Sequence, residues 1–155
     1  MTVLAWSDQL ALGNAEMDAT HREFVDLLNA LGAAEGDAIL GSLDAFIAHT
    51  EAHFAQEEAW MEEKQFPPRR CHRTEHANIL EVVRDVRGRI AGGEQHYGRT
   101  LAEALAEWFP VHAASKDAML ALFLENPEIF KHTGSCGDPD HVCHEADETH
   151  AAAGD

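Results

Sequence analysis

The chain has 155 residues and 45% apolar content, which suits one domain with a real core and lies well above the range of disordered chains. Its formal net charge of −17, from 11 Lys and Arg against 28 Asp and Glu, argues against nucleic acid and anionic membranes as partners and suits a protein that binds cations. Three cysteines are too few for a disulfide scaffold, and without a basic leader or a long apolar span we expect a cytoplasmic protein with no membrane insertion.

Four helices are predicted in chain order, each from apolar residues at helical spacing and from the breakers that follow it. The segment GAAEGD ends the first helix, FPP at 66–68 stops the second, and Gly92-Gly93 closes the third. No alternating run favours a strand. The four helices cover approximately residues 18–31, 38–64, 69–90 and 97–124. The pattern predicts an all-α fold, an up-down-up-down four-helix bundle.

The apolar residues of these helices are expected to form the core. In the later turns of the third and fourth helices they include Val82, Val83, Met119 and Leu120.

Segments of different character flank the bundle. The opening MTVLAWSDQLALGNAE is expected to be an ordered arm anchored by Trp6. From Lys131 the chain is small, polar and punctuated by glycine, so we expect a bundle domain over 1–130 and a flexible tail over 131–155. Two alternatives stay open for the histidines and cysteines of the tail: a disordered segment, which composition favours, or a metal-binding or redox-responsive site. These residues are Cys136, His141, Cys143 and His144.

Each predicted helix carries histidine, and on two of the helices a carboxylate four or five residues after it joins the candidate set. In HTEAHFAQEE at 49–58, His53 and Glu57 stand four apart, which places them on one helical face. The other helices carry a single histidine, a pair of histidines, or a histidine followed by an aspartate. The full set is His21, His53, Glu57, His72, His76, His112 and Asp117.

This set points to a metal site inside the bundle, where facing helices can combine their side chains. Imidazole suits iron, copper and zinc, and carboxylates can bridge two hard cations. Seven ligands are too many for one four-coordinate zinc. Two metals that share both carboxylates and one water-derived oxygen would use all seven ligands and leave one position open for a small ligand.

The order and spacing of these residues resemble those of the hemerythrin family, in its bacterial single-domain form. The resemblance runs from Trp6 to about Phe123 and is carried by AWSDQLALGNAEMDATHREFVDLLN, HTEAHFAQEEAWM, FPPRRCHRTEH and WFPVHAASKD. It implies reversible dioxygen binding at a non-haem di-iron centre, for oxygen storage, transport or delivery to an oxygen-consuming client enzyme. It also implies that the protein is not an enzyme, and we expect a monomer.

The resemblance further implies how the ligands divide between two irons that cycle between Fe(II) and Fe(III). Glu57 and Asp117 bridge the irons, together with an oxo or hydroxo group. The iron that keeps an open position for O2 has two histidine ligands, His21 and His53. The other iron has three histidine ligands, His72, His76 and His112.

Three positions depart from the family pattern. Thr20 replaces a glutamine, His49 stands where a tyrosine is common, and Ala113 replaces a larger aliphatic residue, which is expected to widen the ligand pocket. We expect His49 to be structural or to lie beside the ligands, and His96, next to a glycine turn, to be exposed.

The spacing of His112 and Asp117 conflicts with a regular helix if both are to reach one centre. Five residues rotate two side chains by about 140° on an α-helix. Pro110 removes a backbone donor, and Ser115 can hydrogen-bond a freed carbonyl. We therefore predict a π-type or kinked turn between about 109 and 117. The alternative is a regular helix on which the reach of the carboxylate absorbs the offset.

Other functions are weighed against this one. His72-x-x-Glu75-His76 fits the pattern of an inverted zinc metallopeptidase, although it leaves the ligands of the other helices unexplained. A ferritin-like di-iron oxidase would repeat Glu-x-x-His, which this chain lacks. Oxygen or redox sensing and iron handling remain alternatives.

Overall fold

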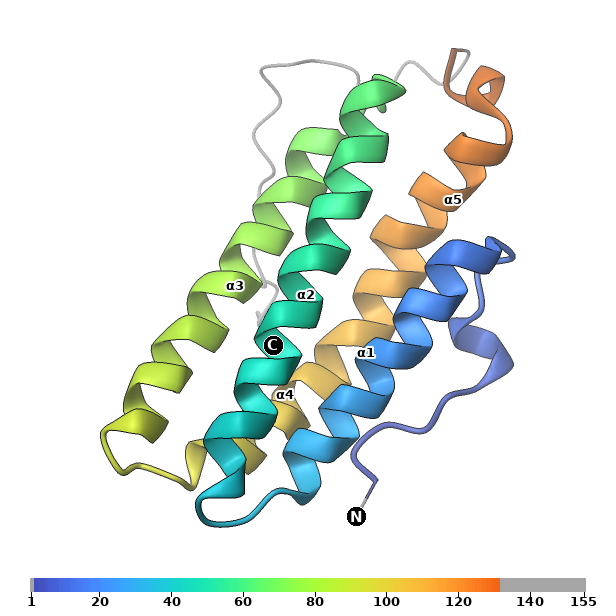
Figure 1. The fold of residues 1–155 in the computed structure, drawn as a ribbon. Coiled ribbons are helices and arrows are strands. Elements are labelled where there is room, and N and C mark those ends of the chain that lie inside the picture. The colour runs from blue at the N-terminus through green and yellow to red at the C-terminus, as the bar shows by residue number, and fades with distance from the viewer. Residues whose placement is uncertain (1, 132–155) are drawn as a thin grey trace, which may run out of the picture.

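The protein is an antiparallel bundle of four helical rods (Figure 1), seen in a computed structural model that describes residues 2–131. α1 and α3 each pack against both α2 and the fourth rod, and neighbouring rods run in opposite directions. The rods are α1 (Ala15–Ala33), α2 (Ala38–Glu63), α3 (Arg69–Ala91), and a fourth that joins α4 (Tyr97–His112), the π-helix η2 (Ala113–Asp117) and α5 (Ala118–Glu125). Two 3₁₀ turns flank the rods, η1 (Asp8–Leu10) and η3 (Pro127–Lys131), and the described residues form no strand. The predicted all-α, up-down-up-down architecture is confirmed.

The helix ends follow local chemistry. α1 begins three residues before the predicted start, because the Asn14 side chain accepts hydrogen bonds from the backbone N–H groups of Glu16 and Met17, each at 3.1 Å. α3 ends next to the predicted glycine pair, where Gly93 adopts a φ of 105° that favours glycine.

The N-terminal arm is tied to α1 by side-chain contacts. The Asn29 side chain accepts hydrogen bonds from the backbone of Val3 at 2.8 Å and of Leu4 at 3.1 Å, and it donates to the Leu4 carbonyl at 2.8 Å. The Arg22 guanidinium lies 4.4 Å from the centre of the Trp6 ring. The predicted arm with Trp6 as its anchor is therefore present.

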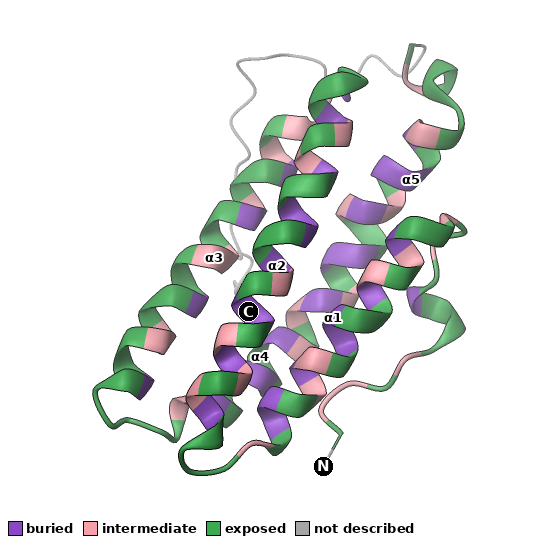
Figure 2. Ribbon diagram, viewed as in Figure 1, coloured by how far each residue is buried: buried purple, intermediate pink, exposed green. Residues whose placement is uncertain are grey.

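Buried residues line the inner faces of all four rods (Figure 2) and form two apolar clusters. The large cluster occupies the end of the bundle that holds the α1–α2 and α3–α4 loops. The small cluster occupies the opposite end. Buried members of the large cluster include Phe24, Leu28, Phe46, Val83, Leu105, Phe109 and Ala113. Those of the small cluster are Met17, Met61, Phe66, Leu120, Ala121 and Phe123.

Two predicted core residues lie on the surface instead. Val82 is 49% exposed and Met119 is 43% exposed. Each precedes a residue that is fully buried, Val83 and Leu120 respectively, and one residue turns a helix by about 100°. Val83 and Leu120 therefore face the core, and the residues before them point toward the surface.

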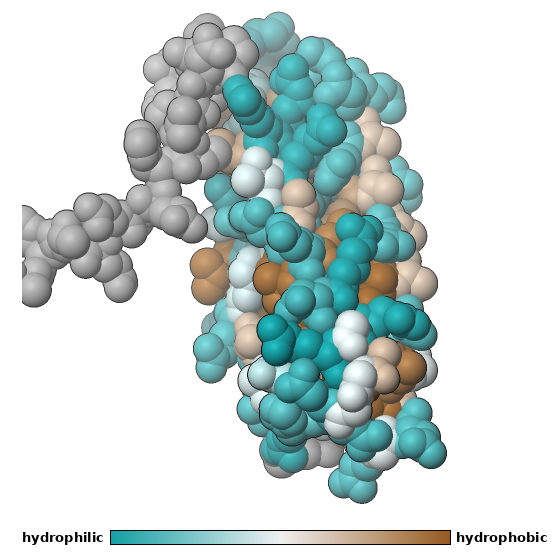
Figure 3. Space-filling view, turned by 90° about the vertical axis from the view of Figure 1, so that its left-hand side faces the viewer, coloured by the Kyte–Doolittle hydropathy of each residue, from teal (hydrophilic) through white to brown (hydrophobic). Residues whose placement is uncertain are grey.

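The visible surface is mostly hydrophilic, with isolated apolar groups between the charged ones (Figure 3). Within residues 2–131 no helix combines the length and the apolar content that crossing a membrane requires. The tail residues Cys136, His141, Cys143 and His144, and the predictions made for them, lie outside the described residues.

Candidate metal centre

Seven buried ionisable side chains meet between the four rods, and they are the seven residues that the sequence singled out. None is more than 4% exposed. α1 contributes one, α2 and α3 two each, and the fourth rod two, one from the end of α4 and one from the end of η2. In that order they are His21, His53 and Glu57, His72 and His76, His112 and Asp117.

This polar layer is closed at both ends by the two apolar clusters. On α1, His21 lies between Met17 of the small cluster and Phe24 of the large one. On the fourth rod, Asp117 lies between Ala113 of the large cluster and Leu120 of the small one. The helical spacing that builds the core thus also seals the ionisable groups from bulk water.

A π-turn brings the two site residues of the fourth rod together, as predicted. α4 ends at His112, and the five residues Ala113–Asp117 form a π-helix. The Ser115 hydroxyl donates a hydrogen bond to the Val111 carbonyl at 2.7 Å, the backbone relief expected for this residue. His112 Nε2 consequently lies 3.0 Å from Asp117 Oδ1. The alternative of a regular helix is wrong.

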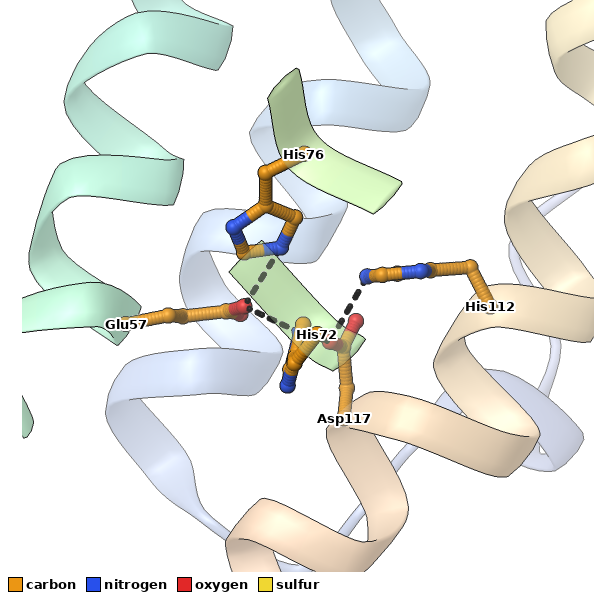
Figure 4. A group of neighbouring side chains, drawn as sticks. All are labelled: Glu57, His72, His76, His112 and Asp117. Carbon is orange, nitrogen blue, oxygen red and sulfur yellow. Dashed lines mark ion pairs between the residues drawn. The ribbon is translucent and has the colours of Figure 1, made fainter. Parts of the chain in front are cut away.

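The site residues fall into two overlapping groups whose potential ligand atoms lie within 4.8 Å of one another. Both groups contain Glu57 and Asp117. The three-histidine group adds His72, His76 and His112 (Figure 4), and the two-histidine group adds His21 and His53. Each group contains the residues that the resemblance assigned to one iron, and the assignment of irons to these groups stays a prediction.

Nitrogen and oxygen atoms in the site approach one another without satisfying their hydrogen-bonding capacity. His72 Nε2 lies 3.0 Å from Asp117 Oδ1, and His21 Nε2 lies 3.2 Å from Asp117 Oδ2. These four atoms are buried and none makes a hydrogen bond. A buried polar atom without a partner costs about 1–3 kcal/mol. Cations between these groups would satisfy them, and imidazole with carboxylate is a donor set that suits iron.

Two of the histidines are basic in the metal-free protein. Burial opposes protonation of His21, but the adjacent Asp117 and Glu57 carboxylates outweigh it and raise its pKa from 6.5 to about 9. For His112, burial is likewise outweighed by Asp117 and Glu75, and the pKa rises to about 9. These imidazoles must lose a proton before they can bind a metal.

The shared carboxylates stay ionised despite their burial. Burial raises the pKa of Glu57, but contacts with His21, His53 and other imidazoles lower it well below the usual range. The pKa of Asp117 is also lowered, because its histidine contacts outweigh burial and the nearby Glu57 charge. Two negative charges are therefore held where the two groups overlap, which favours cations there.

Aromatic side chains form the walls of the site and fix the planes of its imidazoles. The sequence predicted ordinary core packing for them. Phe54 stacks on His76 with ring centroids 3.8 Å apart and an interplanar angle of 2°. Trp108 stacks on His112 at 4.5 Å. These core residues therefore also orient the candidate ligands.

Two glutamates that sequence reasoning did not place in the site contact the outer nitrogens of its histidines. Glu75 Oε2 lies 2.5 Å from His112 Nδ1, and Glu58 Oε1 lies 3.3 Å from His76 Nδ1. The sequence singled out Glu75 only as part of the peptidase pattern, and nothing separated Glu58 from the other glutamates of an acidic protein. The zinc-peptidase alternative, with His72 and His76 as metal ligands, leaves most of the seven buried residues of the site without a role.

The two other histidines within residues 2–131 lie where the sequence suggested. His49 is half-buried beside the site, with Nε2 3.2 Å from the Thr20 carbonyl and its ring centre 6.0 Å from that of His53, and it belongs to neither ligand group. His96 is exposed before α4.

Comparison with known proteins agrees with this geometry. The sequence profile described as "Hemerythrin HHE cation binding domain" matches residues 12–123. The chain is 49% identical to the bacteriohemerythrin of Ralstonia nicotianae over 124 residues. This aligned region covers 80% of this chain and 90% of that protein. It is 31% identical over 125 residues to the bacteriohemerythrin of Stenotrophomonas maltophilia, with 78% and 81% covered. A bacteriohemerythrin of Methylococcus capsulatus is 27% identical over 106 residues, with 66% and 81% covered. The chain belongs to the hemerythrin family.

Proposed function

We propose that this protein binds dioxygen reversibly at a di-iron centre held by the seven buried residues, and that it stores oxygen or delivers it to an oxygen-consuming enzyme. The observation that carries the proposal is the pair of overlapping ligand groups that share Glu57 and Asp117. One metal alone would leave part of this set buried without a partner. Family membership and the names of its relatives support the choice of iron and dioxygen.

The residues have separate tasks in this proposal. The three-histidine group supplies one more imidazole than the two-histidine group. A metal held by the two-histidine group would therefore have one free coordination position, at which a small ligand could bind. Bound iron supplies the reversible electron exchange with dioxygen. The protein orients the imidazoles by aromatic stacking, keeps both carboxylates ionised, and excludes water with the apolar clusters on either side.

An absorption experiment tests the proposal. Protein loaded anaerobically with Fe(II) should bind two irons per chain, gain a visible charge-transfer band when exposed to dioxygen, and lose the band when dioxygen is removed. A His53→Ala variant, which lacks a ligand of the two-histidine group, should lose the reversible band. Two bound irons without any reversible band would instead favour the iron-handling alternative, and a single bound metal would refute the di-iron centre.

A further inference from the structure

We propose that Glu75, with Glu58 in a lesser role, is a positioning residue that makes the three-histidine subsite the tighter of the two metal subsites. The inference rests on the proposed metal centre and concerns its asymmetry. It predicts that the two irons leave the protein at different rates, and that the slower rate depends on a carboxylate that does not itself belong to either ligand group.

The outer nitrogens of the five site histidines, their Nδ1 atoms, differ in their hydrogen-bond partners. His112 Nδ1 contacts Glu75 at 2.5 Å and His76 Nδ1 contacts Glu58 at 3.3 Å. The Nδ1 atoms of the other three are buried without a hydrogen-bond partner in the described part of the chain. They belong to His21, His53 and His72. Carboxylate partners on Nδ1 are therefore confined to the three-histidine group.

A carboxylate at Nδ1 determines what the other ring nitrogen can do. When Nδ1–H donates to Glu75, the tautomer of His112 is fixed and the lone pair of Nε2 is left for a metal. That Nε2 atom faces the shared carboxylate Asp117 at 3.0 Å. The negative charge of the partner also makes the imidazole a stronger donor. The same contact thus aims the ligand and strengthens it.

The structure ranks Glu75 above Glu58. The Glu75 contact is the shorter one, and the ring of its histidine is also held by stacking on Trp108. Glu58 lies farther from its histidine, and its other oxygen faces Arg73 Nε at 3.6 Å, so its charge is divided between two partners. Glu75 is 38% exposed, so a substitution there leaves the apolar core intact.

Release of iron to an excess of an Fe(II) chelator, measured anaerobically, tests the inference. In the wild-type protein we expect two phases, with the slow phase from the three-histidine subsite. Loss of an outer carboxylate partner commonly reduces metal affinity by about 10–100-fold. Glu75→Ala should therefore accelerate the slow phase by about this factor, with a smaller effect from Glu75→Gln, whose amide oxygen still accepts a hydrogen bond. Glu58→Gln should have the smallest effect of the three.

Glu81→Gln is the matched control, because Glu81 is exposed on the same helix and the charge change is the same. An independent readout is the exchangeable Nδ1–H signal of His112 in Zn(II)-loaded protein with ¹⁵N-labelled histidine. The signal should be protected from solvent exchange in the wild type and the control, and should be lost in Glu75→Ala.

Three results would overturn the inference: unchanged release from Glu75→Ala, equal acceleration by Glu81→Gln, or a His112 signal that does not respond to Glu75. If Glu75→Ala fails to fold, the near-isosteric Glu75→Gln decides, with unchanged release counting against the inference. A wild-type protein that never holds two metals would instead refute the proposed centre itself.

Discussion

Raising the pH should destabilise the metal-free protein, because two histidines of its site keep their protons to a higher pH in the folded chain than in the unfolded chain. The pKa values of His21 and His112 rise from 6.5 to about 9 on folding. A group with a raised pKa contributes its full stability below the unfolded value and loses it as pH rises through the folded value. The lowered pKa values of Glu57 and Asp117 act at acid pH, so these carboxylates do not oppose the trend above pH 6.5.

The size of the effect follows from the same contacts. A pKa shift of one unit corresponds to about 1.4 kcal/mol. One such histidine therefore contributes about 3 kcal/mol to the free energy of unfolding at pH values below 6.5. The two histidines share Asp117, and their contributions are therefore not additive. We expect the free energy of unfolding to fall by about 3 kcal/mol between pH 6 and pH 10, a large part of the roughly 5–15 kcal/mol typical of a domain.

Urea unfolding followed by circular dichroism, with metals removed by a chelator, measures this fall. The Asp117→Asn variant is the control, because it removes the carboxylate that both histidines face, and its stability should depend much less on pH in this range. Protein loaded with two metals should also lack the fall, since its histidines are already deprotonated. Flat wild-type stability from pH 6 to 10, or equal slopes in wild type and Asp117→Asn, would refute the reasoning.

Three further predictions concern metal loading, the ligand pocket and the packing of the helices. A Glu57→Ala, Asp117→Ala double variant should bind much less than two irons per chain by metal analysis, and full occupancy would contradict the bridging role of these carboxylates. Ala113→Leu should exclude water and so prolong the oxygenated state, measured in repeated spectra, while overpacking lowers the free energy of unfolding by about 1–3 kcal/mol. Faster autoxidation of a folded variant would contradict the placement of Ala113 in the ligand pocket. Gly98→Ala should lower the unfolding midpoint, because its Cβ would lie 2.6 Å from Ile39 Cγ2, whereas an unchanged midpoint would show that Ile39 can move aside.

The sequence by itself determined the elements and the composition of the site. Apolar spacing and breakers such as Gly93 placed the helices, because helix formation depends on residues that are near in the chain. The same holds for the π-turn: the five-residue spacing of His112 and Asp117, together with Pro110 and Ser115, concerns one continuous segment.

Beyond the seven site residues, only the tertiary structure decided which side chains meet across helices. Glu75 and His112 are 37 positions apart, and their contact depends on the rotation and depth of two rods that no local spacing specifies. The stacking of Phe54 on His76 and the exposure of Val82 have the same origin. Spacing along one helix determines which residues share a face of that helix, but it does not determine which residues of another helix pack against that face. The outer partners that orient the candidate ligands therefore became visible only when the rods were packed together.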